Sequence, residues 1–290
     1  MKHRLAITLL FVLTVSAVAQ TKSGFITTSD GIRIHYLDAG SGRPIVFIPG
    51  WTMPAWIWQP QIDAFSKHYR VIAIDPRSQG ESDKPNFGHL PERRSRDYKE
   101  VVDQLGLKQP VLVGWSMGCA ELLKYAEQFG TDSLAGLVLV DGYTPEKPNP
   151  EAVLGMSGWM NQLQSDRAKQ ADGFVRGMYK KPQPEEYLKK VVKAAQQTPD
   201  DTAAVLIYNM LAVKDYGKAL TAVHCPIFFA YTPQAQETAD FLKSKLGEKL
   251  QLEKFEDVGH ALFVDDAEKF NRVLEAFMQI TAQHCHTCVQ

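Results

Sequence analysis

Residues 111–118 read Val-Leu-Val-Gly-Trp-Ser-Met-Gly, and this stretch gives the strongest indication of the fold. It fits the pattern G-x-S-x-G, and it stands between an apolar run and a helical stretch at 117–129. A sharp turn from strand to helix needs small flanking residues because the backbone is crowded. It also exposes the serine hydroxyl at the start of the helix, where the helix dipole favours negative charge. An ordinary glycine-serine loop is the alternative, but the strand-to-helix context favours Ser116 as a nucleophile.

The segments around this turn alternate between apolar strands and helices. The strands are continuous runs of Val, Ile and Leu, which is typical of a parallel sheet covered on both faces. A hairpin at 24–39, centred on Asp30 and Gly31, precedes them. The sequence therefore predicts an α/β fold, with strands at 44–48, 70–74, 110–113, 134–140, 226–231 and 250–255, and helices at 56–69, 91–105, 117–129, 235–246 and 266–281.

The alternation stops near residue 144. Pro145, Pro148 and Pro150 form a stiff linker, and the segment after them contains helical stretches rich in Met, Trp and Tyr. A helical block inserted between two strands of a parallel sheet is typical of a lid, and helices that only complete the core are the alternative. The predicted organisation is a core in two parts, 20–144 and 223–282, with a helical cap at 145–222 and a tail at 283–290.

Residues 1–19 are predicted to be a signal peptide. Lys2, His3 and Arg4 form a basic start, apolar or small residues follow, and Ala17-Val18-Ala19 fits a cleavage site. The apolar stretch is shorter than the roughly 20 residues that span a bilayer. We therefore expect an exported protein, periplasmic or secreted, without stable membrane insertion after cleavage.

The charge balance excludes one class of partner. The chain has 32 basic and 33 acidic residues, and removal of Lys2 and Arg4 with the signal peptide leaves 30 basic against 33 acidic. Such a surface exerts no long-range attraction on nucleic acid, so no nucleic-acid partner is expected. The hydrophobic fraction of 44% is that of a globular domain. The sequence does not indicate the oligomeric state.

A serine nucleophile needs a base and an acid. His260 follows the last predicted strand, in a loop at the expected carboxyl edge of the sheet, where open α/β sheets carry their active sites. Asp141 follows the strand at 134–140 and is predicted to orient the imidazole and stabilise its protonated form. The loop after the next strand contains no Asp, and its nearest carboxylate, Glu237, is the alternative acid. A packing role for His260 and a turn role for Asp141 are the structural alternatives.

Backbone N–H groups are needed to bind the oxyanion that forms during attack. Met117 at the helix start and Trp51 in the loop after 44–48 are the predicted donors, and Gly50 allows close approach of the backbone. Large apolar residues border the same segments, and Met53, Trp56 and Trp159 are the predicted pocket residues. Ordinary core packing is the alternative for such residues.

The cysteines predict neither a metal site nor a redox site. Cys285 and Cys288 follow a helix rather than open one, so they lack the dipole that activates a redox pair. One short tail rarely surrounds zinc alone, so a local disulfide or a disordered end is expected there. Cys119 and Cys225 lie elsewhere in the chain. No metal and no organic cofactor is expected.

Together these motifs resemble the α/β-hydrolase superfamily, in its serine esterase and non-haem haloperoxidase-like branch. The chain order Ser116, Asp141, His260 matches the family's order of nucleophile, acid and base. Residues 75–82, Asp-Pro-Arg-Ser-Gln-Gly-Glu-Ser, resemble its D-x-R-G-x-G-x-S loop, with Ser78 in place of a Gly. The resemblance covers about residues 24–282. It implies a mostly parallel eight-stranded sheet with helices on both faces and an inserted helical cap.

Three features depart from the family pattern. The oxyanion loop begins with Pro49 and Gly50, where the family usually has His-Gly. The family's acid usually follows the penultimate strand, where this chain has Gln234. One branch of haloalkane dehalogenases places the acid after the previous strand, as Asp141 is placed here. Those dehalogenases use an Asp nucleophile, whereas Ser116 points to acyl transfer.

The predicted function is hydrolysis of carboxylic esters of a hydrophobic small molecule through an acyl-enzyme. A perhydrolase or haloperoxidase-like activity, a lactonase, a carbon–carbon bond hydrolase and an aminopeptidase-like amidase would use the same residues. Glu185 and Glu186 in the cap could hold the amine of an aminopeptidase substrate, and a solvated helix start explains them equally well. A non-catalytic ligand-binding protein on the same fold is the alternative from another class.

Overall fold

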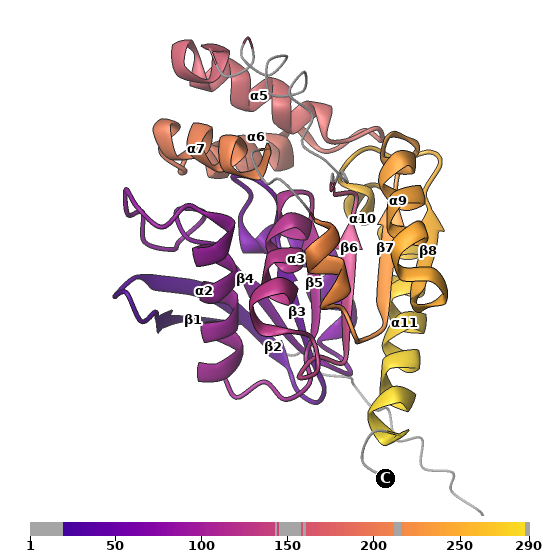
Figure 1. Ribbon diagram of the computed structural model, residues 1–290. Coiled ribbons are helices and arrows are strands. Elements are labelled where there is room, and N and C mark those ends of the chain that lie inside the picture. Colours follow the sequence, from indigo (N-terminus) through magenta and orange to yellow (C-terminus); the bar gives the residue numbers. More distant parts are fainter. Residues whose placement is uncertain (1–19, 143, 145–157, 159–160, 212–215, 288–290) are drawn as a thin grey trace, which may run out of the picture.

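The structure, a computed structural model, describes residues 20–142, 144, 158, 161–211 and 216–287 (Figure 1). Within these residues eight strands form one sheet in the order β1-β2-β4-β3-β5-β6-β7-β8. The strands are β1 (Lys22–Thr27), β2 (Arg33–Gly40), β3 (Pro44–Ile48), β4 (Arg70–Ile74), β5 (Val111–Trp115), β6 (Gly136–Val140), β7 (Ile227–Tyr231) and β8 (Leu250–Lys254).

The sheet is mostly parallel. Strands β3 to β8 pair in parallel, whereas β1 pairs antiparallel with β2, and β2 antiparallel with β4. Gly31 adopts a φ of 84° in the turn between β1 and β2, a conformation that favours glycine. The predicted hairpin and the predicted mostly parallel eight-stranded sheet are therefore confirmed.

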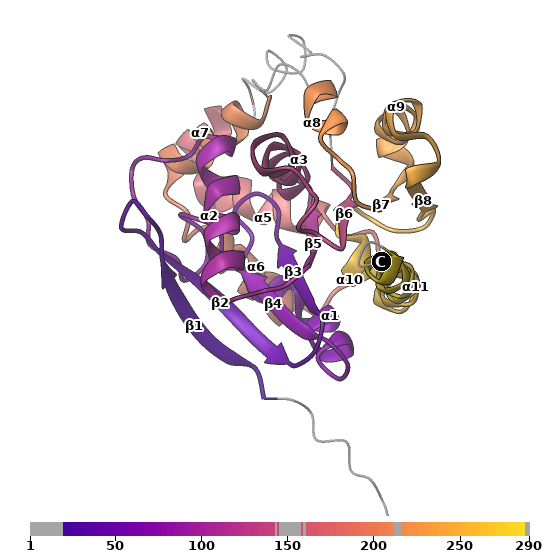
Figure 2. The same ribbon diagram turned by 60° about the horizontal axis from the view of Figure 1, so that its bottom comes forward.

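Alternate residues of the central strands face two separate apolar layers. In β3, Ile45 and Phe47 belong to one layer, and Val46 and Ile48 belong to the other. This is the consequence of a side-chain period of two in a sheet that is covered on both faces. Helices α1 (Gln59–Phe65) and α11 (Ala267–Thr287) cover the first layer, and α2 (Pro91–Gln104), α3 (Met117–Phe129), α8 (Gly217–Thr221) and α9 (Gln236–Leu246) cover the second (Figure 2).

Three helices between β6 and β7 lie beyond the strand ends rather than on a face of the sheet (Figure 1). They are α5 (Arg167–Gly177), α6 (Glu185–Ala195) and α7 (Asp200–Leu211). Trp51, in the loop that follows β3, contacts Phe174 of α5 and Ala203 of α7. The inserted helices therefore cover the carboxyl end of the sheet, as the predicted fold requires. The domain boundaries stay predictions, because residues 145–157 and 212–215 lie outside the described residues.

Two predicted helices differ from the structure by several residues. The helix predicted at 56–69 is wrong as a single helix: it is a 3₁₀ turn, η1 (Ala55–Trp58), followed by α1, which ends at Phe65. Pro60 lies in the first turn of α1, where its missing N–H needs no partner. Helix α11 continues to Thr287, six residues beyond the predicted end at 281, so Cys285 lies within the helix and does not follow it as predicted. The remaining short elements among the described residues are η2 (Pro233–Ala235), η3 (Gly247–Lys249) and α10 (Leu262–Asp265).

Several predictions fall on residues that the structure does not describe. The signal peptide at 1–19 and Cys288, which the predicted disulfide requires, lie outside the described residues. Cys119 and Cys225 are buried free thiols.

Within the described ranges, no helix combines the length and apolar character needed to cross a membrane. The same residues contain no group of three or more His, Cys, Asp or Glu side chains arranged to hold a metal ion.

Candidate active site

Ser116 occupies the turn between β5 and α3 in a strained backbone conformation. Its φ is 56° and its ψ is −116°, a region that costs a residue with a side chain about 1–3 kcal/mol. A Cβ built on Gly114 would lie 2.6 Å from the carbonyl oxygen of Gly118, so the approach of strand and helix leaves no room for a side chain there. The turn places the half-buried Ser116 directly before the first residue of α3. This is the predicted strand-to-helix turn.

His260 and Asp141 lie together at the same edge of the sheet. His260 Nδ1 is 2.8 Å from Asp141 Oδ2, and the side chains are 31% and 6% exposed, respectively. The other carboxylate oxygen of Asp141 accepts hydrogen bonds from the backbone N–H and the hydroxyl of Thr232, at 2.7 and 2.8 Å. These donors hold the carboxylate, so Nδ1 carries the imidazole proton and Nε2 is free to act as a base.

The loop after β7 contributes to this arrangement in a way that the sequence did not reveal. It contains no Asp, but Thr232 in this loop donates both hydrogen bonds that orient Asp141. The alternative acid, Glu237, lies in the first turn of α9 and is exposed. The structure therefore brings Asp141, and not Glu237, to His260.

Trp115 connects the serine turn to the histidine loop. Its indole Nε1–H donates to the backbone carbonyl of His260 at 2.9 Å, and its ring lies 5.1 Å from the imidazole. Among the hydrogen bonds of the described residues, none joins the Ser116 hydroxyl to the imidazole. In unliganded enzymes such catalytic hydrogen bonds are often long and shorten only when substrate binds.

The predicted oxyanion donors belong to two segments that adjoin Ser116. Met117 is the first residue of α3, so its N–H has no partner within the helix. Trp51 lies in a turn closed by a hydrogen bond from Met53 N–H to the Gly50 carbonyl, at 3.2 Å. A Cβ built on Gly50 would lie 3.0 Å from Ser116 Cβ, so this turn directly adjoins the nucleophile.

Gln79 holds the oxyanion turn, a role that no local sequence pattern predicts. Its side-chain amide donates to the carbonyls of Gly50 and Met53 at 3.0 and 2.9 Å, and the residue is fully buried. Ser78 and Gly80 on either side have φ values of 69° and 48°. The D-x-R-G-x-G-x-S loop therefore turns sharply here, and Ser78 adopts a conformation that glycine would adopt with less strain.

A buried ionic pair connects Gln79 to the nucleophile helix. Arg94 of α2 donates to the side-chain oxygen of Gln79 at 3.0 Å, and its Nε donates to Glu121. Glu121 lies on α3, one turn after Met117. The chain of contacts thus joins the two segments that carry the predicted oxyanion donors. A buried Gln within the loop motif, together with buried charges on the two following helices, is a combination that only the folded structure reveals.

The cap is anchored on Trp51. The indole Nε1–H donates to the carbonyl of Ala203 in α7 at 2.8 Å, and the ring contacts Phe174 edge-on at 4.9 Å. The guanidinium of Arg167 lies over the same ring at 5.4 Å. Movement of these cap helices would therefore displace the turn that carries one predicted oxyanion donor.

Asp265 clamps the histidine loop to the cap. One of its carboxylate oxygens accepts hydrogen bonds at 2.7 Å from the backbone N–H groups of both Gly259 and Lys180. The N–H of Ala261 in turn donates to the carbonyl of Met178 at 2.9 Å. The backbone on both sides of His260 is therefore tied to the segment between α5 and α6. The sequence contained no signal for this role beyond the position of Asp265 five residues after His260.

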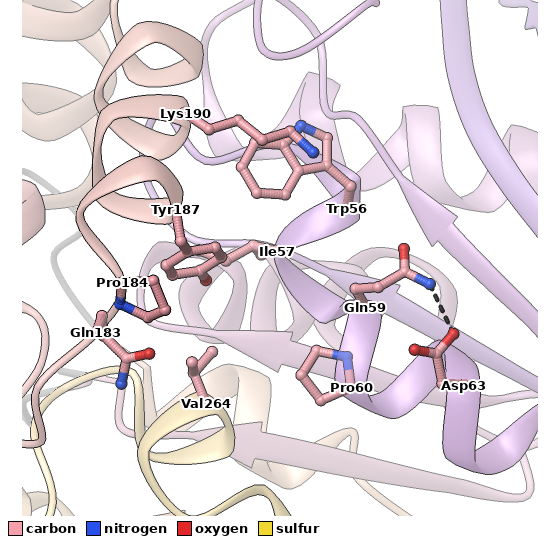
Figure 3. A pocket seen from close by; sticks show the side chains of 10 residues that line it. All are labelled: Trp56, Ile57, Gln59, Pro60, Asp63, Gln183, Pro184, Tyr187, Lys190 and Val264. Atoms are coloured by element: carbon pink, nitrogen blue, oxygen red, sulfur yellow. Dashed lines mark hydrogen bonds between the residues drawn. The ribbon is translucent and has the colours of Figure 1, made fainter.

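The predicted pocket residues have different surroundings. Met53 is fully buried and belongs to the core cluster, and Trp159 lies outside the described residues. Trp56 lines a cavity of ≈ 580 Å³ between the cap helix α6 and the η1–α1 segment (Figure 3). The wall near the histidine loop is Val264 of α10. The cavity is lined by Trp56, Ile57, Gln59, Pro60, Asp63, Gln183, Pro184, Tyr187, Lys190 and Val264.

The cavity wall combines aromatic rings with one cation. Lys190 Nζ lies 4.0 Å from the centroid of the Trp56 ring, and the ring of Tyr187 lies 6.3 Å from it (Figure 3). Tyr187 OH lies 3.2 Å from Tyr179 OH. Burial raises the pKa of both phenols, so they stay protonated at neutral pH. The cavity therefore has an apolar wall and hydrogen-bonding groups at its edges, as small-molecule pockets do.

His89 makes the stability of the fold depend on pH. It is 7% exposed, and its carbonyl accepts a hydrogen bond from Asn209 of α7. Burial, followed by the nearby charges of Arg94 and Arg77, lowers the pKa of His89 from 6.5 to about 4. Between these pH values the unfolded chain binds a proton that the folded chain excludes. The folded state therefore loses stability as the pH falls from 6.5 to 4, by at most about 3 kcal/mol.

Urea unfolding at pH 7 and pH 4 measures this effect. The free energy of unfolding of the wild type is expected to fall more steeply between the two pH values than that of His89→Gln, which has no group to protonate. Parallel decreases in the two proteins would show that other groups cause the loss of stability in acid.

The fold agrees with comparisons to known proteins. A model of the alpha/beta hydrolase family matches residues 45–273, a span that contains Ser116, Asp141 and His260. The chain belongs to the alpha/beta hydrolase family. The resemblance that the motifs predicted is thereby confirmed.

The similar members of this family include haloperoxidases and esterases. A non-heme haloperoxidase from Rhodococcus erythropolis is 38% identical over 134 residues, which are 44% of this chain and 49% of that protein. A bifunctional esterase/perhydrolase from Acinetobacter calcoaceticus is 34% identical over 125 residues, 42% of this chain and 45% of that protein. The chain thus spans about half the length of these two curated relatives. The solved structure of an esterase from Exiguobacterium antarcticum has a TM-score of 0.82 and 25% identity, covering 88% of this chain and 98% of that one.

Proposed function

We propose that this alpha/beta hydrolase cleaves carboxylic esters of a hydrophobic small molecule through a serine acyl-enzyme. The observation that carries the proposal is the His260–Asp141 pair, held at 2.8 Å at the same sheet edge as the strained turn of Ser116. A strained backbone turn is a costly feature that clusters at functional sites, and the imidazole hydrogen-bonded to a buried carboxylate supplies a base at the same edge. The esterase among the similar solved structures supports the choice of substrate class.

The steps follow from the roles of these groups. Ser116 Oγ attacks the ester carbonyl carbon while His260 Nε2 takes its proton, and Asp141 stabilises the imidazolium. The N–H groups of Trp51 and Met117 bind the oxyanion of the tetrahedral intermediate. His260 then returns the proton to the leaving alcohol. A water molecule, deprotonated by His260, attacks the acyl-enzyme and releases the acid.

The cavity beside Trp56 supports a hydrophobic substrate. It borders α10, which follows the His260 loop directly, and its wall is mainly aromatic and aliphatic. Burial of an acyl or aryl group in this cavity would lower the free energy of binding by about 25 cal/mol per Å² of apolar surface removed from water. Longer or aromatic groups are therefore expected to raise kcat/KM relative to acetate.

Steady-state hydrolysis by the purified wild type tests the proposal. A panel of p-nitrophenyl acetate, butyrate and benzoate, with a lactone and an anilide for comparison, is expected to give turnover of the esters and little of the anilide. Absence of turnover with every compound, together with no fluorophosphonate adduct on Ser116, would favour the non-catalytic ligand-binding alternative.

Perhydrolysis is a second candidate, favoured by the similarity to the bifunctional esterase/perhydrolase. Hydrogen peroxide would replace water in the attack on the acyl-enzyme, and the product would be a peracid instead of the acid. The same Ser116, His260 and Asp141 would serve both reactions. Formation of peracetic acid from acetate ester and hydrogen peroxide, compared with hydrolysis in the same tube, measures the partition between them.

The Gln79 contacts give a prediction about the oxyanion turn. Gln79→Met keeps the approximate volume but removes both N–H donors to the carbonyls of Gly50 and Met53. The turn that presents Trp51 N–H then loses its support. Since loss of an oxyanion donor costs about 10²–10³ in kcat, a displaced donor is expected to cost about 10- to 100-fold, with KM little changed.

Gln128→Met is the matched control for this variant. Gln128 on α3 donates to Ser95 Oγ and to the Glu92 carbonyl, at 2.6 and 3.0 Å, so it also connects α3 to α2, but far from the oxyanion turn. Its kcat is expected to equal that of the wild type. Equal kcat values for both variants would remove Gln79 from the oxyanion machinery.

A further inference from the structure

A second serine, histidine and aspartate are hydrogen-bonded in series on the antiparallel edge of the sheet. Ser23 Oγ lies 2.8 Å from His35 Nε2, and His35 Nδ1 lies 2.7 Å from Asp75 Oδ2. Ser23 is on β1, His35 is on β2, and Asp75 follows β4, which are three consecutive strands of the sheet. The connectivity is that of a nucleophile, a base and an acid, at a place remote from Ser116 in the strand order.

The register of the hairpin brings the serine to the imidazole. Phe25 pairs with His35, and Ser23 pairs with Leu37, so Ser23 and His35 are diagonal neighbours on one face of the sheet. The side chains of residues two apart on a strand point to the same face. The contact therefore follows from strand pairing and does not depend on a flexible loop.

Asp75 is oriented as firmly as Asp141. Its Oδ1 accepts a hydrogen bond from Ala55 N–H at 2.5 Å, and its Oδ2 accepts one from Glu81 N–H at 2.9 Å. The carboxylate also accepts the Nδ1–H of His35, so in the neutral imidazole Nε2 is left to accept the hydroxyl proton of Ser23. Asp141 has the same pattern of two other donors and one imidazole.

The base and the acid of this series are buried, whereas the serine is exposed. The side chains of His35 and Asp75 are 7% and 3% exposed, and the ring of Phe25 lies 5.0 Å from the imidazole. Ser23 itself is exposed, on a strand at the edge of the sheet. The base and acid interact in a low-dielectric environment, and the hydroxyl is accessible to a reagent in solution.

We propose that Ser23 is a second activated serine, which is modified by acyl or phosphonyl donors that carry a good leaving group. With a fluorophosphonate, Ser23 Oγ attacks phosphorus as its proton passes to His35 Nε2. The Oγ–P bond forms, the P–F bond breaks, and fluoride leaves. Asp75 holds the Nδ1–H of the resulting imidazolium, which then loses the added proton to water.

Ser23 lacks the features that would make it a turnover site. Ser116 directly precedes α3, whose first N–H groups can bind an oxyanion, whereas Ser23 lies within a strand. The reaction at Ser23 therefore stops at the covalent adduct, because among the described residues no helix N-terminus is placed there to stabilise the oxyanion when water attacks the adduct. Unactivated esters are not expected to react there.

The test uses the full chain with Ser116→Ala, so that Ser116 cannot react. A fluorophosphonate is added, and the rate of adduct formation on each serine is measured by peptide mass spectrometry. Ser29 is the internal control, since it is an exposed serine in the same hairpin whose hydroxyl contacts Glu100 and no imidazole. General-base assistance contributes about 10²–10⁴-fold, so Ser23 is expected to react at least about 100-fold faster than Ser29.

Two further measurements identify the cause of this reactivity. Adding His35→Asn is expected to reduce the Ser23 rate to that of Ser29. Because a buried substitution can prevent folding, the Ser116→Ala chain is also labelled in urea, where the two rates are expected to become equal. Equal rates in the folded protein, or a Ser23 rate unaffected by urea, would overturn the proposal. Turnover by the wild type tests ester hydrolysis separately, so either proposal can fail alone.

Discussion

Ser116→Ala is expected to lower kcat for p-nitrophenyl butyrate by about 10⁴- to 10⁶-fold, the range found when a serine nucleophile of a triad is removed. Alanine keeps the Cβ and the turn conformation but has no oxygen to attack the ester carbonyl. His260, Asp141 and the oxyanion donors remain, so residual activity above the uncatalysed rate is expected from binding and oxyanion stabilisation alone.

Two controls separate loss of the nucleophile from loss of the fold. The melting temperature of Ser116→Ala is expected to stay within a few degrees of the wild type, because the hydroxyl makes no hydrogen bond that the structure shows among its described residues. Ser29→Ala removes an exposed hydroxyl from the hairpin and is expected to keep full kcat. If Ser116→Ala retained more than about a tenth of the wild-type kcat, the acyl-enzyme mechanism would be wrong.

Asp141→Asn is the second change with a large expected effect. The Asn oxygen can still accept the hydrogen bonds from Thr232, so the loops keep their places. Its NH₂ group would then face His260 Nδ1, which favours the tautomer with the proton on Nε2, and that tautomer cannot deprotonate Ser116. The amide also carries no charge to stabilise the imidazolium. A decrease of about 10⁴-fold in kcat is expected, with KM and the melting temperature close to those of the wild type.

Glu237→Gln is the matched control for the acid. Glu237 is exposed at the start of α9, so its replacement is expected to leave kcat unchanged. The opposite pattern, with Glu237→Gln inactive and Asp141→Asn active, would move the acid to the loop after β7. Full activity of both variants would leave a mechanism in which Ser116 and His260 act without a carboxylate.

Much of the fold could be predicted because the signals are local. Continuous apolar runs identified the parallel strands, and the hairpin was visible from alternation around Asp30 and Gly31. Helix ends were predicted less well, since they depend on tertiary contacts as well as on propensity. The helix predicted at 56–69 is interrupted at Gln59, where α1 begins with Pro60 in its first turn, and α11 continues to Thr287. Neither difference involves Ser116, Asp141 or His260, although Trp56 of the cavity wall lies in the 3₁₀ turn.

Some residues of the candidate site could likewise be predicted from local patterns, whereas others depend on tertiary contacts. The strand-to-helix turn at Ser116 and the loop of His260 each have a sequence pattern of their own. The choice between Asp141 and Glu237 has none, because it depends on which loop reaches His260 across 119 residues of chain. The roles of Gln79, Asp265 and Thr232 were missed for the same reason: each acts through contacts between segments that are distant in sequence.

The amino-acid sequence alone determined the α/β class, the strained serine turn and the loop that carries the histidine, since these follow from short-range patterns of apolar residues and glycines. The tertiary structure alone decided which carboxylate meets His260, what holds the oxyanion turn, and that Ser23 lies against His35 and Asp75. The physical reason is that strand order and register set the distances between loop side chains, and no local pattern encodes those distances.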